Sequence, residues 1–210
     1  MRAAYHQALD NARLDVVRLG ALTLDAVKSS THALERRDDA LAARVIAGDD
    51  EIDDMRRSVE SACIELIWKQ QPVAGELRAI AGMLQIVTDL ERIGDYAVDI
   101  SKNAIKLTDV PVRPASIEIG QIAATAATML ADAMRAYREN DMVLADSVIE
   151  RDDEVDHLYR SGIVALQSEM QHDSTVVPAG TILLFVLATI ERVGDRAQNI
   201  CWKSKDIYGA

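Results

Sequence analysis

One twelve-residue stretch occurs twice in the chain, and this repetition constrains the fold more than any other feature. The first copy covers residues 89–100 and the second covers residues 189–200, so each half of the 210-residue chain holds one. Both copies follow the pattern aliphatic-Glu-Arg-aliphatic-Gly-Asp-x-Ala-x-Asx-Ile. Internal repetition at a long, fixed interval is typical of proteins that build one structural unit twice or more. We therefore predict two tandem copies of the same fold.

The composition favours helices over sheets. Hydrophobic residues make up 49% of the chain but aromatic residues only 4%, and ten glycines and four prolines leave long stretches without a helix breaker. Apolar residues recur every three or four positions, which is the spacing of a helix with one buried face, and no segment alternates as a convincing strand would. The predicted fold is all-α, with two tandem pseudo-repeated three-helix bundles.

A linker is expected at residues 109–114, which contain two prolines and show no periodicity. It separates a first three-helix bundle at residues 1–108 from a second at residues 115–210. The predicted helices span residues 5–34, 40–47, 49–70, 76–106, 116–137, 142–150, 152–170 and 177–205.

The middle arm of each bundle is predicted to be bent. In the first half, a short helix is expected to stop at Gly48 and a longer one to start at Asp49, which would act as its N-terminal cap. In the second half, Asp152 occupies the matching place after a short helix that ends at Glu150. Helix capping would thus explain both aspartates without any ligand.

Each copy of the repeated stretch places acidic residues on the inner half of a helix. With about 100° of rotation per residue, Glu91 falls within the apolar stripe that should face the core, and Asp95 and Asp99 follow on one flank. A carboxylate buried without a partner is costly, so we expect it to be neutral, paired or bound to a metal ion. Gly94 costs roughly 1 kcal/mol in a helix relative to alanine, which suggests that another backbone or a ligand approaches there.

These acidic faces are the candidate metal sites. Oxygen ligands suit hard cations such as Mg²⁺, Mn²⁺, Ca²⁺ or ferric iron, and the middle helices add aspartates four positions apart, which share a helix face. The alternative is that these acids are caps, partners of arginines or solvated residues. The candidate ligands are Glu91, Asp95, Asp99, Asp49 and Asp53 in the first half and Glu191, Asp195, Asn199, Asp152 and Asp156 in the second, where Asn199 replaces a carboxylate by an amide.

Charge and motif content exclude several classes of function. A formal net charge of −11 and a pI near 4.8 argue against binding to nucleic acid or to an anionic membrane surface. The sequence has no P-loop, dinucleotide fingerprint or nucleophile elbow, so we do not expect an enzyme. Glu-x-x-His occurs twice, at Glu154 with His157 and at Glu169 with His172, but within one stretch of the chain, whereas a di-iron helical bundle needs the two motifs on different helices.

The sequence also indicates a soluble protein. The N-terminus lacks the apolar core of a signal peptide, and the most apolar run, residues 176–190, is too short to cross a bilayer, so we expect no membrane insertion. Cys63 and Cys201 form no CxxC pair and are predicted to be packing residues in a reducing cytoplasm. Wide apolar stripes on alanine-rich helices make a homodimer plausible.

The doubled stretch resembles the signature of the PhoU family of phosphate-specific transport accessory proteins. Residues 70–78, Gln-Gln-Pro-Val-Ala-Gly-Glu-Leu-Arg, are similar to the family's entry into its third helix. The resemblance covers essentially the whole chain and implies two three-helix bundles. It also implies a non-enzymatic, negative regulator of phosphate uptake and of the phosphate-starvation response. Such a regulator acts between the ATPase subunit of the phosphate ABC transporter and a sensor histidine kinase, so it would be peripheral at the inner membrane.

Metal ions such as Fe, Mn, Mg or Zn are a further implication of the resemblance. The family's acidic-x-x-x-Asp motif maps onto Glu91 with Asp95 and onto Glu191 with Asp195. The second repeat departs from the first because Asn199 stands in it and the Gln-Gln-Pro entry is absent, so equal occupancy of the two sites is not expected. Two rivals stay open: a metal-dependent oxidase or storage bundle, and a metal-free helical adaptor whose acidic face meets basic partners.

Overall fold

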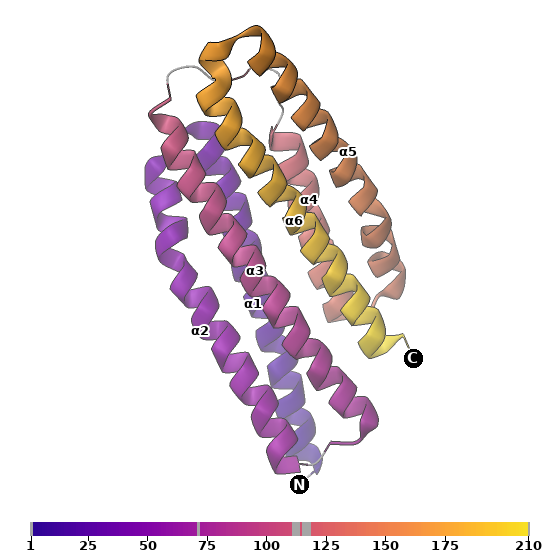
Figure 1. Ribbon diagram of the computed structural model, residues 1–210. Coiled ribbons are helices and arrows are strands. Elements are labelled where there is room, and N and C mark those ends of the chain that lie inside the picture. Colours follow the sequence, from indigo (N-terminus) through magenta and orange to yellow (C-terminus); the bar gives the residue numbers. More distant parts are fainter. Residues whose placement is uncertain (1, 71, 111–113, 115–118, 210) are drawn as a thin grey trace.

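Six long helices make up the described part of the chain, which contains no strand. The computed structural model describes residues 2–70, 72–110, 114 and 119–209, and the all-α prediction is confirmed. The helices are α1 (Arg2–Arg36), α2 (Asp39–Gln70), α3 (Ala74–Thr108), α4 (Ile119–Glu139), α5 (Met142–His172) and α6 (Val177–Tyr208), with a short 3₁₀ turn, η1 (Ser174–Val176), before α6 (Figure 1).

The helices form two three-helix bundles that lie side by side. α1, α2 and α3 pack on one another, as do α4, α5 and α6, and the bundles meet where α3 contacts α6 and α1 contacts α4. In Figure 1, α2, α3, α6 and α5 form a front layer, and α1 and α4 lie behind it. The predicted pair of tandem three-helix bundles is therefore present.

α1, α3, α4 and α6 each contact three other helices, whereas α2 and α5 each contact two. Ile86, Leu90 and Ile93 of α3 and Ile190 of α6 are almost completely buried. Within the described residues, the segment Ser174–Tyr208 is long and apolar enough to cross a membrane by length and composition, but half of its apolar window is buried in the protein. Packing against three neighbouring helices therefore accounts for its high hydropathy.

The middle helix of each bundle is continuous, so the predicted break in each middle arm is wrong. α2 runs through Gly48 and α5 runs through Glu150 without interruption. Asp49 and Asp152 therefore lie inside helices and cap neither. A glycine in a helix interior costs roughly 1 kcal/mol relative to alanine, but Ile52 in the next turn is only 5% exposed. Burial of such side chains outweighs the cost of the glycine.

Matching turns fix the register between the two bundles. The first hairpin turns at Arg37 (φ 54°) and the second at Asn140 (φ 56°), both in the left-handed region. Asp38 and Asp141 follow them, and each accepts a hydrogen bond from the backbone N–H three residues further on, at 2.8 and 3.0 Å. Residues of α1 and α2 thus correspond to residues of α4 and α5 at an interval of 103, while α3 and α6 correspond at the motif's interval of 100.

The connection between the bundles runs from the end of α3 at Thr108 to the start of α4 at Ile119. The Thr108 hydroxyl donates a hydrogen bond to Asp39 Oδ1 at 2.8 Å, and Val110 packs against the core. The first bundle therefore remains packed to the end of α3. Part of the predicted linker, 111–113, and the predicted start of the second bundle, 115–118, lie outside the described residues.

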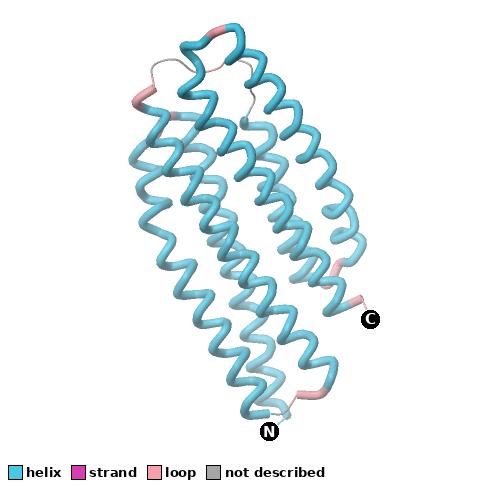
Figure 2. The backbone as a smooth tube through the Cα atoms, viewed as in Figure 1, coloured by secondary structure: helices cyan, strands magenta, loops and turns pink. Residues whose placement is uncertain are grey.

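The bundles are displaced along their long axes, so that the first extends beyond the second at the end where the N-terminus lies (Figure 2). α1 has 35 residues, whereas α4 has 21. The N-terminal part of α1 therefore continues past the end of α4.

The two cysteines are packing residues, as predicted. Cys63 in α2 and Cys201 in α6 are free thiols that are completely buried. Burial raises the pKa of Cys63 to about 11 and that of Cys201 to about 12. Because the thiolate is the reactive form, both side chains are inert near neutral pH.

Candidate carboxylate seams between helices

A glycine brings α2 close to α3 in the first bundle. A methyl group at Gly94 would lie 3.2 Å from two carbon atoms of Ile52 and 3.6 Å from Asp49 Oδ1. The missing side chain leaves room for these two residues of α2. The sequence predicts a close approach at this glycine by a backbone or a ligand, and the structure places neighbouring side chains there.

The second bundle repeats this contact between α5 and α6. A methyl group at Gly194 would lie 3.3 Å from Val155 Cγ1 and 3.4 Å from Asp152 Oδ1. Each repeated motif therefore receives one apolar side chain and one carboxylate from the middle helix of its own bundle. We call these two contact regions the α2–α3 seam and the α5–α6 seam.

Carboxylates from two helices gather at the α2–α3 seam. Partial burial, followed by repulsion from Asp95 and Asp53, raises the pKa of Asp49. Burial and then repulsion from Asp95 raise the pKa of Glu91. These effects require that acids of α2 and α3 lie within electrostatic reach of one another, so the structure brings together four of the predicted residues.

The α5–α6 seam is electrostatically similar. Burial and the nearby Asp195 and Asp156 carboxylates raise the pKa of Asp152 to about 6. The pKa values of Glu191 and Asp195 are also raised, first by burial and then by neighbouring acids. Four predicted residues thus meet in the second bundle as well.

Several of these carboxylates are paired with arginines of their own helices. Arg92 Nη1 lies 3.2 Å from Asp95 Oδ2, and its Nε lies 3.6 Å from Glu91 Oε2. Arg57 contacts Asp53 at 3.2 Å, and Asp156 is similarly paired with Arg160 in α5. The acids therefore face cationic neighbours along the helix as well as acids across the seam.

No preformed metal cage exists in the described part of the chain, where no three His, Cys, Asp or Glu side chains are arranged to hold an ion. The oxygen donors suit a hard cation, but the carboxylates would have to turn away from their arginines to converge. Glu91 is 21% exposed at its side chain, so it lies at the margin of the core rather than within it. Asp99 is exposed and Asn199 is half-buried.

The two seams differ in one amide contact. Gln198 donates a hydrogen bond to Asp152 Oδ2 at 2.9 Å and contacts the Ile149 carbonyl at 3.3 Å. The residue at the equivalent position of α3 is Val98, which cannot donate. Instead, Lys102 lies near enough to Asp49 to lower its pKa, against the larger effect of burial.

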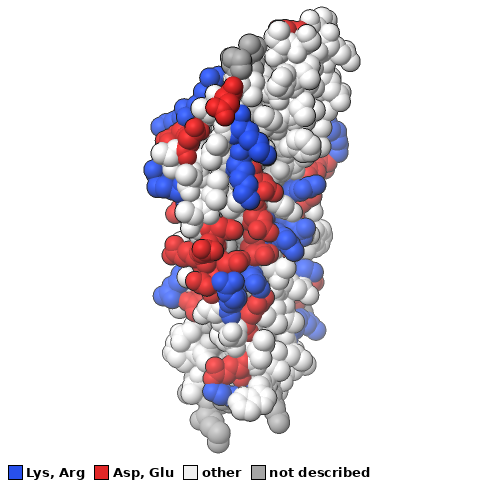
Figure 3. Space-filling view, turned by 60° about the vertical axis from the view of Figure 1, so that its left-hand side comes forward, with Lys and Arg blue, Asp and Glu red and all other residues white. Residues whose placement is uncertain are grey.

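Acidic side chains gather near mid-height on the face of the molecule that Figure 3 shows, with basic side chains among and around them. The α2 sequence accounts for much of this, since five of the six residues from 49 to 54 are acidic. Glu154 and His157 are both exposed on α5. That pair therefore does not join an inward-facing di-iron site.

An ion pair that sequence reasoning missed joins the two bundles. Arg196 Nη1 of α6 donates a hydrogen bond to Asp89 Oδ1 of α3 at 3.1 Å. The pKa of Arg196 is raised, and the largest cause is its hydrogen bond with Tyr96. Asp89 is 8% exposed, and its burial raises its pKa although Arg196 acts in the opposite direction. The sequence did contain a sign of this pair, because each of the two charges occurs in only one motif copy. The other copy has Thr189 at the position of Asp89 and Tyr96 at the position of Arg196.

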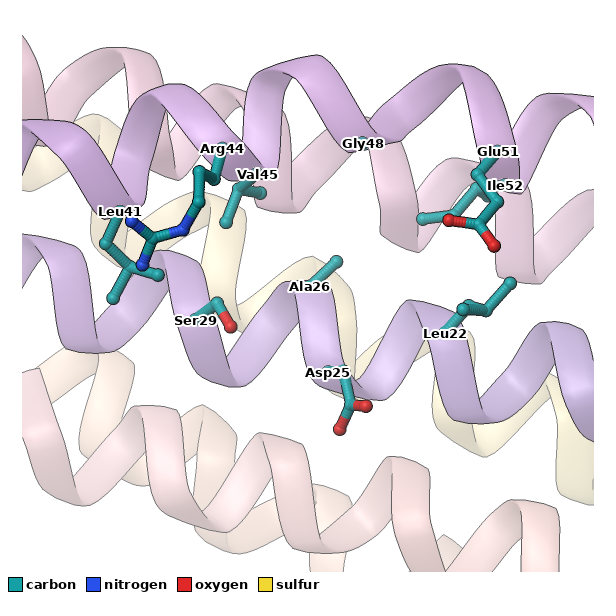
Figure 4. Close-up of a pocket in the computed structure, with 10 residues that line it drawn as sticks. All are labelled: Leu22, Asp25, Ala26, Ser29, Leu41, Arg44, Val45, Gly48, Glu51 and Ile52. Carbon is teal, nitrogen blue, oxygen red and sulfur yellow. The ribbon is translucent and has the colours of Figure 1, made fainter.

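A hollow of about 210 Å³ lies between α1 and α2, and Ile52 of the α2–α3 seam forms part of its lining (Figure 4). Ser29 and Gly48 line it, and no atom lies within 4 Å of where a Gly48 side chain would begin. Their counterparts in the second bundle are Asp132 and Arg151, which form an ion pair of 2.8 Å between α4 and α5. The hollow therefore marks the place where the first bundle lacks this ion pair.

A sequence profile described as "PhoU domain" matches residues 16–104 and 119–203, once in each bundle. The chain belongs to the PhoU family. It is 36% identical over 201 residues to the "Phosphate-specific transport system accessory protein PhoU homolog" of Clostridium acetobutylicum, with 95% of this chain and 92% of the relative covered. It is 30% identical over 197 residues to the "Phosphate-specific transport system accessory protein PhoU" of Escherichia coli, with 94% and 82% covered.

Solved PhoU structures share this fold. The crystal structure of PhoU from Pseudomonas aeruginosa matches with a TM-score of 0.94 at 30% identity, covering 98% of this chain and all of that one. The crystal structure of the phosphate transport system regulatory protein PhoU from Streptococcus pneumoniae matches with a TM-score of 0.89 at 24% identity, covering 97% and 96%. The pair of three-helix bundles is thus an architecture that PhoU proteins adopt.

Proposed function

We propose that this protein is a non-enzymatic regulator of phosphate uptake and of the phosphate-starvation response, with cation sites at its two seams. Its curated relatives are described as accessory proteins of phosphate-specific transport. The observation that carries the cation sites is that each bundle gathers carboxylates from two helices around a glycine contact, with raised pKa values in both.

The proposed partners are the ATPase subunit of the phosphate ABC transporter and a phosphate-responsive sensor histidine kinase. The protein would act as a homodimer in the cytoplasm, reaching the inner membrane through these partners. An acidic face suits partners whose docking surfaces are basic, because complementary charge speeds association and fixes orientation. In this function the protein damps the starvation response when phosphate is plentiful.

A cation at a seam would lock two helices together. The ion pairs of Arg92 and Arg57 are exposed, and such pairs contribute about 0–1 kcal/mol to the stability of the fold. Replacing these arginines by a bound cation as the partner of the carboxylates would therefore cost little. The cation would relieve the repulsion between Asp49 and Asp95 and link α2 to α3. Iron, manganese, magnesium and zinc are the candidate ions. The locked seam would then present one fixed surface to the partner.

Metal content tests the cation sites directly. Protein purified without chelator or affinity tag is analysed by plasma mass spectrometry, as wild type and as Glu91→Ala/Asp95→Ala and Glu191→Ala/Asp195→Ala variants. Each double variant should lose the metal of its own bundle and keep that of the other. A matched control is Asp54→Ala, an exposed acid of α2 that pairs with Arg57. Unchanged metal content and unchanged partner binding in both double variants would refute the cation sites.

Partner binding tests the regulatory role separately. Wild type and both double variants are used to capture the purified ATPase subunit and the sensor kinase, and a phosphate-starvation reporter is measured in cells that lack the native gene. Wild type should bind the ATPase subunit and repress the reporter in high phosphate. A wild-type protein that binds neither partner and leaves the reporter unchanged would overturn the proposal.

A metal-free adaptor is the second candidate, and one observation favours it. The described carboxylates form no group that could hold an ion as they stand, and several are already paired with arginines. In this case the purified protein would be free of metal, yet folded and able to bind the transporter ATPase subunit.

A further inference from the structure

A strip of exposed apolar side chains continues the α2–α3 seam towards the end of the molecule where the N-terminus lies. On α2 it comprises Ile64, Ile67 and Trp68, and Trp68 is 78% exposed. On α3 it comprises the exposed Leu77 and the partly buried Leu84. On the face that Figure 3 shows, the surface below the acidic side chains is mostly uncharged. We call these five residues the apolar strip.

Helical geometry places the apolar strip in line with the acids of the seam. With about 100° of rotation per residue, Asp53 and Ile64 lie within about 20° of each other on α2. On α3, Leu77, Leu84 and Glu91 follow one another at intervals of seven residues, which is about two turns. Asp53 and Glu91 are both carboxylates of the α2–α3 seam. The two rows therefore run along the same side of the bundle, and the apolar strip is the continuation of the seam.

The fold does not require apolar residues at these positions. At the interval of 103 that relates α2 to α5, the positions of Ile64 and Trp68 are occupied by Gln167 and Gln171. Both glutamines are exposed, and α5 packs in its bundle as α2 does. A contiguous exposed apolar patch that the fold does not need indicates a surface that another molecule covers.

No described helix covers the apolar strip. The side chain of Ile207, near the end of α6, packs over Gly82 of α3, so the first two turns of α3 extend beyond α6. α1 lies behind the layer that contains α2 and α3 (Figure 1). A helix laid along the apolar strip would have α2 and α3 as neighbours, as the fourth helix of a four-helix bundle has two neighbours.

The charges around the apolar strip favour a basic occupant. Residues 49–60, at the end nearer the seam, contain six acids and two arginines. Further along α2, Glu65 and Lys69 pair with each other and add no net charge. An occupant therefore meets an excess of carboxylates at one end, which Lys or Arg side chains would complement. A second copy of this chain carries the same excess of acids, so charge complementarity favours a different protein.

We propose that the apolar strip docks an amphipathic helix of a partner protein, whose apolar face ends at a cluster of Lys or Arg residues. The apolar face packs on Ile64, Leu77 and the Trp68 ring, and the basic end meets Asp53 and Glu60. The stretch of α2 from Asp53 to Trp68 is about 22 Å long at 1.5 Å per residue, so a helix of about four turns covers it. The proposal rests on the regulatory function only in that a regulator needs a protein partner, and it requires no metal ion.

Intrinsic fluorescence tests the docking, because the chain has two tryptophans. In Trp202→Phe, Trp68 reports on the apolar strip, and in Trp68→Phe, Trp202 reports on the other bundle. The probe is a designed helical peptide of about 18 residues, with leucines along one face and lysines at its C-terminal end. Added to the metal-free full chain, it should move the Trp68 emission to shorter wavelength and leave the Trp202 emission unchanged.

Two control peptides separate docking from general attraction to an acidic protein. One has the same composition in a scrambled order, so that its leucines share no face, and it should bind at least about tenfold more weakly. The other has glutamates in place of the lysines and should bind at least about fivefold more weakly, because its end repels the carboxylates.

Variants of the full chain locate the docking surface. In the Trp202→Phe background, Ile64→Ser/Leu77→Ser should weaken binding of the lysine peptide at least about tenfold, because two apolar contacts are lost. Val164→Ser is the matched control, since it removes an aliphatic side chain that is 65% exposed on α5. It should bind as the background chain does, and circular dichroism checks that each variant is folded.

Several results would overturn the proposal. The lysine peptide could leave the Trp68 emission unchanged up to about 1 mM, or bind no more tightly than the scrambled peptide. Ile64→Ser/Leu77→Ser could bind it as tightly as Val164→Ser does.

Other occupants give their own signatures, and each would also overturn the proposal. A shift of the Trp68 emission when the protein alone is concentrated, together with a dimer in sedimentation, would assign the apolar strip to a second copy. The same shift with vesicles of phosphatidylcholine and phosphatidylglycerol would assign it to a lipid surface. Because the titration uses no metal, transporter or kinase, its failure is distinguishable from a failure of the regulatory function.

Discussion

The two bundles have the same arrangement of helices, but different contacts hold the first two helices of each bundle together. In the second bundle, Arg151 reaches from α5 to Asp132 on α4, and Arg135 holds the other carboxylate oxygen at 3.1 Å. In the first bundle, Gly48 and Ser29 occupy the equivalent positions and leave a hollow. The helices nevertheless pair in the same register, because the turns and the apolar seams are alike. We call the ion pair between Asp132 and Arg151 the polar clamp. The polar clamp is therefore not what sets the arrangement of the helices.

The α5–α6 seam also has a polar contact that the α2–α3 seam lacks. Asp152 is fixed by the Gln198 amide and has a pKa of about 6, whereas Asp49 faces an apolar residue at that position and has Lys102 nearby. Both seams gather like charges, but the second holds its central carboxylate in place. We therefore expect the second seam to be the stiffer one.

The largest effect is expected at the ion pair between Arg196 and Asp89, which joins the two bundles. Arg196→Met leaves the Asp89 carboxylate, whose side chain is 11% exposed, without its partner. A buried charge that loses its partner costs about 3 kcal/mol, so calorimetry should show a melting temperature lower by roughly 6–12 °C. Thr189→Ala, at the position in α6 equivalent to Asp89, breaks only a bond within its helix and should have a far smaller effect. Equal losses would contradict this reasoning.

Removing the polar clamp of the second bundle comes next. Arg151→Met takes away a pair in which the Asp132 side chain is 16% exposed, and we expect a loss of about 2 kcal/mol in urea unfolding. Arg57→Met removes an exposed pair of α2 and should cost less than about 0.5 kcal/mol. A loss in Arg151→Met as small as that of the control would show that the clamp contributes nothing.

Building the clamp into the first bundle is the reciprocal experiment. Ser29→Asp/Gly48→Arg should fill the hollow and gain about 1.5 kcal/mol, most of it because glycine is replaced inside a helix and the rest from a partly exposed ion pair. Ser29→Asp/Gly48→Ala improves the helix equally but supplies no cation, so it should gain less. Urea unfolding of both variants measures the difference. Identical stabilities would mean that the ion pair does not form in the first bundle.

The pH dependence of stability should distinguish the two seams. The folded pKa of Asp152, about 6, lies above its unfolded value, so the charged form destabilises the fold. This penalty is absent below about pH 4 and complete above about pH 6. Asp152→Asn should therefore stabilise the metal-free protein by about 1 kcal/mol at pH 7, after discounting for solvent, and change little at pH 4. Asp49→Asn should follow the same trend more weakly, and a larger effect at pH 4 than at pH 7 would have the wrong sign.

The smallest effect is expected at the hairpin turns. Arg37 and Asn140 share a left-handed backbone, which asparagine adopts more readily than arginine. Arg37→Asn should gain about 0.5 kcal/mol and Asn140→Arg should lose a similar amount. Thermal unfolding of both variants provides the test, and changes of the same sign would refute the explanation.

Much of this architecture can be predicted from the sequence, because the relevant signals are local or repeated. The doubled motif predicts two equal units, and apolar spacing predicts the helices. The error at Gly48 and Glu150 arose because a glycine and a run of acids look like a helix end. Those positions remain helical because residues such as Ile52 are buried against another helix, which no local pattern reveals.

The candidate site, too, can be predicted from the sequence only in part. The motif acids and Gly94 can be identified from the sequence, since their placement on one helix follows from 3.6 residues per turn. The arginine partners of Asp53 and Asp95, four and three positions away on the same helix, also follow from helical spacing. The distances across each seam do not, because they depend on how α2 is rotated against α3.

The sequence by itself determined that the chain would be helical, repeated and acidic along the inner flank of each motif, because periodicity and repetition are properties of the chain alone. Only the tertiary structure decided that Arg196 would meet Asp89 and that Ser29 and Gly48 would leave a hollow. Each of these depends on the offset and rotation of helices that are distant in sequence. Such geometry is set by the packing of whole surfaces rather than by any single residue.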